Sequence, residues 1–83
     1  MTETDIWTAI VAAIREETGN GTLAIEREMT AMDVPGWDSL AHVRILLNLE
    51  DRVGVAVDVD QTYRAACIGD LIGIVTAAMP PRR

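Results

Sequence analysis

The stretch Gly36-Trp37-Asp38-Ser39-Leu40 has the clearest chemical potential in the chain, because it places a serine hydroxyl directly after a glycine turn and an aspartate. Asp and Ser before an apolar run are typical of a helix N-terminus, where their oxygens accept unpaired backbone N–H groups. Capping is the commoner role for such residues. A serine at a helix N-terminus is also exposed, and the helix dipole and free N–H groups there stabilise a phosphate on its oxygen. The stretch therefore indicates either a cap or an acceptor for a phosphodiester at Ser39.

The helix that follows, expected over about 39–53, has two apolar stripes. The first stripe consists of Ile45, Leu46, Leu49 and Val53, with His42 at its upper end. The second stripe consists of Leu40, Val43 and Leu47, and lies roughly 120–140° further round the helix. The remaining face is expected to hold Ala41, Arg44, Asn48, Asp51 and Arg52. One stripe suffices to bury the helix against a small core, so the second either packs under a loop or remains on the surface beside Ser39.

The other periodic segments predict an all-α fold, a bundle with three main helices, one short helix and a long first loop. The first helix is expected over about 5–18, capped by Thr2 or Thr4 and ended by Gly19. A loop over 19–37 should cover the core, with one helical turn near 25–29. Residues 55–57 are compatible with a short extended segment. The expected third and last helices cover about 60–66, capped by Asp58 or Asp60, and about 68–79, stopped by Pro80 and Pro81.

Length and composition limit the possible functions. A chain of 83 residues predicts a single domain over 1–83, with one thin core. The formal net charge of −6, from 13 acidic residues and seven Arg, argues against binding to nucleic acid. One Cys and one His cannot form a disulfide or a structural zinc site, and no metal ligands are expected. With no basic N-terminal region and no long apolar run, we expect a cytoplasmic monomer without membrane insertion.

The excess of negative over positive charge lies in one part of the chain. Residues 1–38 contain eight acidic residues and two Arg, which gives a net charge of −6. Residues 39–53 and residues 54–83 are each balanced, with two of each sign and three of each sign. The second helix is therefore neutral, and we expect its contacts with other proteins to depend on the apolar stripe and Arg44.

The sequence resembles the acyl carrier proteins, the small four-helix modules of fatty acid and polyketide synthesis. The attachment motif of that family, Asp-Ser-Leu after a Gly-x pair, stands here at residues 36–40. The apolar and acidic positions of 43–58 and the apolar positions of 68–75 also fall where the family has its second and last helices. No gap is needed from residue 36 to about 76, while the first helix matches in pattern only.

The resemblance implies a carrier that is not itself an enzyme. Ser39 would receive 4′-phosphopantetheine from coenzyme A through a phosphopantetheinyl transferase, and Asp38 would help to hold Mg²⁺ during that transfer. The arm would then carry an acyl group as a thioester. Leu40, Val43 and Leu47 would form the patch that partner enzymes contact. Those partners would include an acyl- or aminoacyl-loading enzyme and processing enzymes such as a ketosynthase or an acyltransferase.

Five positions depart from the pattern of the family. Arg44 and Arg52 offset the acidic residues of a helix that is commonly strongly acidic, and Trp37 is bulky where a small residue is frequent. Pro35 replaces a usual Leu, and His42 stands where the loop or the cargo approaches. These departures favour a freestanding carrier of a specialised, polyketide-like pathway. They also add Trp37 and Arg44 to the expected partner-binding residues.

Other functions remain open at this point. An aminoacyl or peptidyl carrier of nonribosomal peptide synthesis would share the fold and the arm, although Asp38 before Ser39 favours acyl cargo. An unmodified helical interaction domain would use Ser39 only as a cap. His42 and Cys67 raise the possibility of a Cys–His nucleophilic site. A lone Cys in a reducing compartment is more often a small hydrophobic residue, and so short a chain can hardly enclose a substrate.

Overall fold

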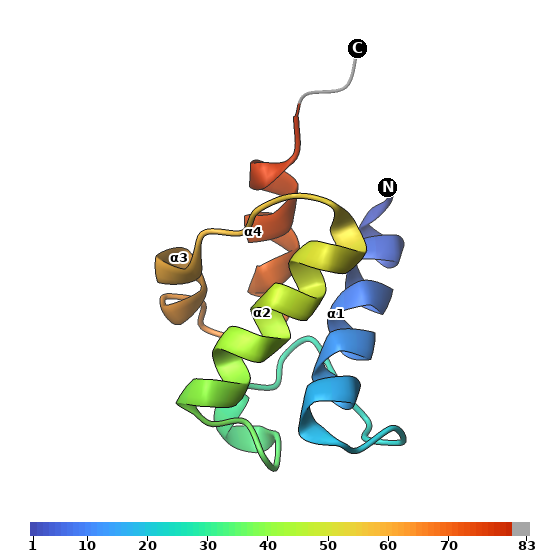
Figure 1. The fold of residues 1–83 in the computed structure, drawn as a ribbon, viewed down its shortest axis with the longest axis vertical. Coiled ribbons are helices and arrows are strands. Elements are labelled where there is room, and N and C mark those ends of the chain that lie inside the picture. Colours follow the sequence, from blue (N-terminus) through green and yellow to red (C-terminus); the bar gives the residue numbers. More distant parts are fainter. Residues whose placement is uncertain (81–83) are drawn as a thin grey trace.

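The computed structural model describes residues 1–80 as a bundle of α-helices, shown in Figure 1. No β-strand forms within this range. The prediction of an all-α fold, with three main helices and one short helix, is confirmed. In chain order the elements are α1 (Glu3–Thr18), the 3₁₀ helix η1 (Ala31–Asp33), α2 (Ser39–Val53), α3 (Val59–Tyr63) and α4 (Asp70–Ala78).

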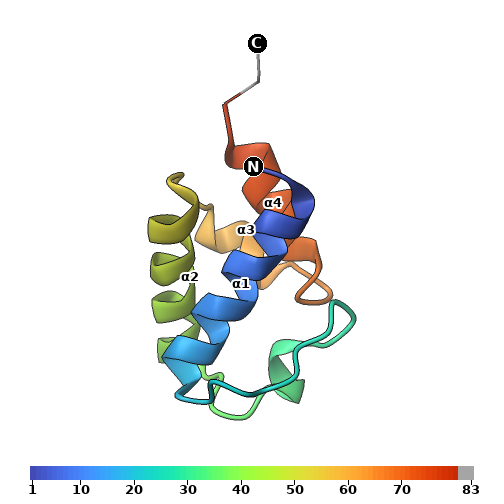
Figure 2. The ribbon, with the colours of Figure 1, turned by 90° about the vertical axis from the view of Figure 1, so that its right-hand side faces the viewer.

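The core lies between α1, α2 and α4. The helices α1 and α2 run side by side, with α4 packed against α1 and the short α3 beside it (Figures 1 and 2). The side chains of Ile10, Ile14, Ile45, Leu49 and Val75 are completely buried there. Each such burial contributes about 1.5–3 kcal/mol, so these stripes hold the bundle together. The connection over 19–38 begins and ends at the end of the bundle opposite the beginning of α1, and between these points it passes up one side of the bundle (Figure 2), where Arg27 reaches Glu3.

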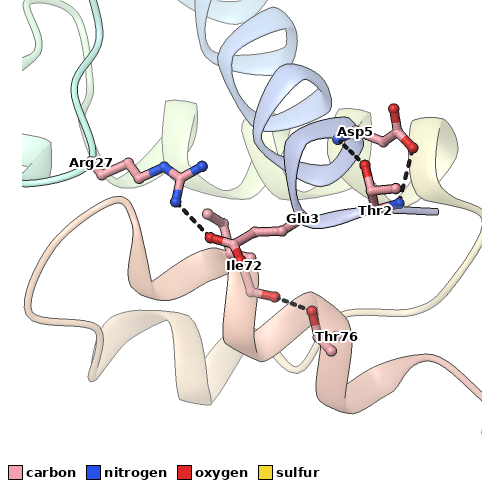
Figure 3. A network of polar contacts seen from close by, with 6 residues as sticks. All are labelled: Thr2, Glu3, Asp5, Arg27, Ile72 and Thr76. Atoms are coloured by element: carbon pink, nitrogen blue, oxygen red, sulfur yellow. Dashed lines mark hydrogen bonds and ion pairs between the residues drawn. The ribbon is translucent and has the colours of Figure 1, made fainter.

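The beginning of α1 is fixed by reciprocal hydrogen bonds, drawn in Figure 3. The hydroxyl of Thr2 accepts the Asp5 N–H at 3.1 Å, and the Thr2 N–H donates to the Asp5 carboxylate at 2.9 Å. This donation from the Thr2 backbone lowers the pKa of Asp5. Because Thr2 is the cap, the helix begins at Glu3, two residues before the predicted start. Glu3 in turn accepts a hydrogen bond of 2.6 Å from Arg27, which ties the long loop to α1.

The last two helices are shorter than the sequence predicts. The predicted third helix continued to Ala66, but α3 ends at Tyr63 because the Ala66 N–H is bound at 2.9 Å by the carboxylate of Asp70. The last helix was expected from Ile68 and begins at Asp70. The N–H groups of Ile68 and Gly69 donate instead to carbonyls of the long loop, at 2.7 and 2.9 Å. α4 ends at Ala78, before Pro80, and the predicted stop at Pro81 lies outside the described residues.

Two details of the connections complete the comparison with the prediction. A hydrogen-bonded turn forms within the expected range 25–29, where the Met29 N–H donates to the Glu26 carbonyl at 3.1 Å. The 3₁₀ helix η1 is a second turn that was not predicted, and the Thr30 N–H begins it by donating to the Asp33 carboxylate at 2.9 Å. The segment 55–57 forms no strand within the described chain; the Val57 N–H is bound by the Glu50 carboxylate at 2.9 Å. None of the helices formed by residues 1–80 is long and apolar enough to cross a bilayer.

Candidate functional site

Ser39 is the first residue of α2, and its side chain is exposed. The N-cap is Asp38, whose Oδ1 accepts the Ala41 N–H at 2.7 Å. The Ser39 hydroxyl makes no hydrogen bond within residues 1–80, so the capping role that the sequence left open for it belongs to Asp38. The first backbone bond of the helix is His42 N–H to Asp38 carbonyl, at 2.8 Å, which leaves the N–H groups of Ser39 and Leu40 ahead of it.

The turn that delivers Ser39 to this position depends on a glycine. Gly36 has φ +86°, in the left-handed region that side chains rarely adopt. Val34 is buried before the turn, and its carbonyl accepts the Trp37 N–H at 3.3 Å. A β carbon at Gly36 would meet Thr18 at 3.7 Å, an ordinary contact, so the glycine is needed for its backbone conformation and not for space.

His42 joins the loop before Ser39 to α3. Trp37 Nε1–H donates to His42 Nδ1 at 3.1 Å, and His42 Nε2 lies 2.9 Å from the Thr62 hydroxyl. The Thr62 hydroxyl itself donates to the Val59 carbonyl at 2.6 Å. The imidazole also stacks on the Tyr63 ring, with centroids 4.3 Å apart. We call Trp37, His42 and Thr62, joined by these bonds, the polar chain.

The polar chain defines the protonation state of His42. Indole N–H is only a donor, so Nδ1 must be unprotonated, and the proton of a neutral ring is then on Nε2, facing Thr62. His42 is only 8% exposed, and this burial lowers the pKa of its imidazole. His42 is thus a neutral structural residue at the edge of the core, with both ring nitrogens occupied.

The second apolar stripe of α2 remains on the surface and does not pack under a loop, and we call it the exposed stripe. Leu40 and Leu47 are each 60% exposed and Val43 is 40% exposed. Three further large apolar side chains, Met32, Val59 and Tyr63, are exposed on η1 and α3. Ala41, expected on the remaining face with Arg44 and Asn48, is instead buried, because it lies one turn before Ile45 on the core stripe.

The two arginines of α2 have different surroundings. Arg52 donates to Glu16 of α1 at 2.7 Å and to Asn48 at 2.6 Å. Arg44 is exposed and makes no ion pair within residues 1–80. Arg52 therefore serves the α1–α2 interface, while Arg44 is a cation available beside the exposed stripe.

Two hollows meet at the polar chain. An open hollow of about 340 Å³ is lined by Ser39 and Asp38, and a smaller, half-open pocket of about 60 Å³ adjoins it, lined by Cys67, Ile68 and Leu71. The lining shared by both consists of Trp37, His42, Thr62, Ala31 and Ala65. The polar chain therefore lines both the hollow at Ser39 and the pocket beside it.

The structure provides no support for a Cys–His nucleophile. His42 and Cys67 both line the smaller pocket, but neither ring nitrogen of His42 is free to take a proton from the thiol. No group of three or more metal-ligating side chains occurs among residues 1–80. Asp38 uses one carboxylate oxygen in the cap, and the other can serve as one of the few protein ligands that Mg²⁺ needs when it is bound together with phosphates.

Sequence reasoning missed Thr62 and Tyr63 as parts of this site. The contact between His42 and Thr62 joins residues 20 positions apart, and no local sequence pattern predicts it. The only available signal was the polar His42 at the end of an apolar stripe, because a buried polar side chain requires a partner.

The chain is similar over most of its length to small bacterial carrier proteins. It is 25% identical over 75 residues to the acyl carrier protein of Exiguobacterium sp. strain AT1b, covering 90% of this chain and 95% of that one. It is 27% identical over 75 residues to that of Exiguobacterium sibiricum, with the same coverage. It is 24% identical over 74 residues to that of Arthrobacter sp. strain FB24, covering 89% and 91%. No family model and no solved structure matches the chain.

Proposed function

The chain belongs to the acyl carrier protein family as a distant member, and from this premise we propose that Ser39 is the attachment point of a 4′-phosphopantetheine arm. As a member of that family the protein is a carrier and not an enzyme. The observation that supports Ser39 most strongly is its exposed hydroxyl, free of any bond within residues 1–80, at the first position of a 15-residue helix.

The surroundings of Ser39 suit a phosphodiester. The N–H groups of Ser39 and Leu40 lie ahead of the first intrahelical bond, and the helix dipole favours a negative charge beside them. Asp38 would keep the helix end in place through its bond to Ala41, and its second oxygen would help to hold Mg²⁺ during attachment. Bound at Ser39, the arm would supply a thiol that carries the acyl group as a thioester, and the tether would raise its effective concentration at a partner.

Partner enzymes would dock on the exposed stripe next to the arm. Leu40, Val43 and Leu47 offer apolar area, Arg44 offers an unpaired cation, and Trp37 lies half-buried beside the attachment point. Rings and apolar side chains that remain exposed beside a functional group are typical of interaction sites. The partners would be a phosphopantetheinyl transferase, a loading enzyme, and acyl-processing enzymes such as a ketosynthase or an acyltransferase.

We further propose that the pathway is specialised and polyketide-like. A neutral α2 with Arg44 exposed would meet partner surfaces of a different charge from those that suit a strongly acidic helix. The mass of the loaded carrier from its native host would distinguish acyl from aminoacyl cargo.

Attachment is tested by incubating the protein with coenzyme A, Mg²⁺ and a broad-specificity phosphopantetheinyl transferase. Intact mass spectrometry should show the addition of one phosphopantetheine to the wild type and none to Ser39→Ala. Another acyl carrier protein, included in the same assay, verifies the transferase. An unmodified wild type beside a modified control would refute the proposal and leave an unmodified interaction domain.

A further inference from the structure

The helices α2 and α3 together form the surface around Ser39, and they run in opposite directions. After α2 the chain crosses over the bundle, and α3 returns toward the start of α2 (Figure 1). Near the end of α2, Glu50 accepts the Val57 N–H at 2.9 Å. Near its start, His42 lies 2.9 Å from the Thr62 hydroxyl. The end of α3 therefore lies beside the start of α2, where Ser39 is, and the beginning of α3 lies beside the end of α2.

The cations of this surface lie at the end near Ser39. Arg44 is in the second turn of α2, and Arg64 directly follows Tyr63, which lines the open hollow together with Ser39. Both arginines are exposed, and neither makes a hydrogen bond or an ion pair within residues 1–80. The other arginines of this range bind groups of the fold, namely Arg15 the Leu23 carbonyl, Arg27 Glu3, and Arg52 Glu16. The two cations left without a partner thus belong to the surface that surrounds the attachment point.

The carboxylates of the same surface lie mainly at its other end. Asp51 follows Arg44 by two turns of α2, about 10 Å further along the helix. Asp58 and Asp60 lie at the beginning of α3. Glu50 and Asp58 each accept a backbone N–H, at 2.9 and 3.0 Å, while the carboxylates of Asp51 and Asp60 are exposed and unbonded in the described chain. The surface is therefore positive near Ser39 and negative at the far end.

Asp38 is the exception, because it places a carboxylate directly before Ser39. One of its oxygens is held in the cap by the Ala41 N–H at 2.7 Å. The positive end of the dipole of α2 lies at the same place and offsets this charge. Arg44 and Arg64 remain as the charges near Ser39 that the fold does not compensate.

Apolar side chains are exposed on the same two helices. Leu40, Val43 and Leu47 form the exposed stripe of α2, and Val59 and Tyr63 are 37% and 58% exposed on α3. Apolar area of this kind gives a partner affinity but no orientation, because the hydrophobic effect is not directional. Separated charges of opposite sign do set the orientation, since only one arrangement pairs them and the reversed one places like charges opposite each other.

We propose that the charges of α2 and α3 orient the partner enzymes on this surface. The partner that fits is acidic beside its active-site entrance, where it meets Arg44 and Arg64, and basic about 10 Å away, where it meets Asp51 and Asp60. This inference rests on the proposed function and specifies the kind of partner that the carrier serves. Such a partner differs from one that suits a helix acidic along its whole length, which would be basic at both places.

The test uses the unmodified protein and a synthetic helical peptide as the probe of a partner surface. The peptide carries leucines along one face, glutamates in one half and lysines in the other half. A nitroxide label is attached to its glutamate end in one sample and to its lysine end in another, and the amide signals of the carrier are followed by NMR. The label on the glutamate end should broaden Leu40 and Arg44, and the label on the lysine end should broaden Asp51 and Asp60. Both preferences should weaken at high salt.

The matched control combines Arg44→Asp with Asp51→Arg, which keeps the net charge of −6 and the exposed stripe. Both positions are exposed, so the double variant should melt like the wild type. It should lose the preference for one orientation, because the charges of α2 then oppose those of α3. A preference that persists in the double variant would overturn the proposal. So would a wild type that binds the peptide in the reverse orientation, in both orientations equally, or not at all.

The result is independent of the arm, because the peptide is added to protein that carries none. If Ser39 is not modified by the transferase, the attachment proposal fails and the orientation of the peptide still tests the charges. If Ser39 is modified but the peptide shows no preferred orientation, attachment stands and only the inference about the partner fails.

Discussion

Leu46 and Leu47 are neighbours on α2 with identical side chains, yet Leu46 is 1% exposed and Leu47 is 60% exposed. Leu46 faces inward with the core stripe, and Leu47 belongs to the exposed stripe that begins beside Ser39. One helix therefore carries two apolar faces with different roles. The buried face holds the bundle together, and the exposed face, which folding does not require, is the surface that we propose for partner enzymes.

The acidic residues add a second contrast. The excess negative charge lies in residues 1–38, but most of its carboxylates are engaged within the fold. Asp5, Asp33 and Asp38 bind backbone N–H groups, while Glu3 and Glu16 pair with arginines. The acidity of this chain thus serves caps and interfaces, whereas the exposed stripe of α2 is neutral apart from the cation of Arg44.

The largest expected effect is the difference in stability between Leu46→Asp and Leu47→Asp. Leu46→Asp buries an unpaired charge at a cost of about 3–5 kcal/mol, against a total stability of about 5–15 kcal/mol. This variant should lose most of its helical circular dichroism or its cooperative melt. Leu47→Asp should melt within a few degrees of the wild type. Similar melts for both variants would show that the two faces are not distinct.

A smaller loss of stability is expected for Trp37→Phe, at the edge of the core. Trp37→Phe keeps a ring but removes the N–H that His42 Nδ1 accepts, leaving a buried acceptor unpaired at a cost of about 1–3 kcal/mol. Urea unfolding measures this difference. Trp7→Phe is the matched control, because no side-chain hydrogen bond of Trp7 occurs in the described chain. Equal losses in the two variants would indicate that ring volume, and not the polar chain, stabilises the loop.

His42 also makes the stability of the fold depend on pH. Burial lowers the pKa of His42 below the ordinary value of about 6.5, so the unfolded chain binds a proton more readily than the folded one. The contribution of neutral His42 is complete above that ordinary value. It is lost as pH falls toward the lowered pKa. Melting temperatures should decline over this window in the wild type and less so in His42→Gln. Since His42 is the only histidine, an identical decline in both would contradict this assignment.

The smallest effect concerns the two arginines. Arg52→Gln removes an exposed ion pair with Glu16 and should cost about 0.2–1 kcal/mol, less at high salt. Arg44→Gln, which breaks no ion pair within residues 1–80, should leave the stability unchanged. Urea unfolding at low and high salt compares them, and a loss at Arg44 equal to that at Arg52 would show that Arg44 is not free.

Local signals allowed much of this fold to be predicted. Thr2, Gly19, Asp38 and Gly54 mark the ends of α1 and α2 through caps that involve residues close in sequence. The limits of α3 and α4 could not be predicted in this way. They depend on bonds such as Ile68 N–H to the Met29 carbonyl, which forms only once the long loop has folded back.

The site shows the same division between local and distant information. The motif around Ser39 and the exposed stripe are visible in sequence, because helical spacing places side chains on one face. The polar chain joins Trp37, His42 and Thr62 from three segments, and only the packing of α3 against the start of α2 brings them together.

The central claim is that α2 has a core stripe that stabilises the bundle and an exposed stripe that contacts partner enzymes. The rate of phosphopantetheinyl transfer to Leu47→Asp tests this claim most directly. The control is Thr8→Asp, which adds the same charge to an exposed position of α1. With melting temperatures unchanged, kcat/KM for Leu47→Asp should fall by about tenfold or more, equivalent to roughly 1.4 kcal/mol. The control should match the wild type. An unchanged kcat/KM for Leu47→Asp would contradict the assignment of this face to transfer.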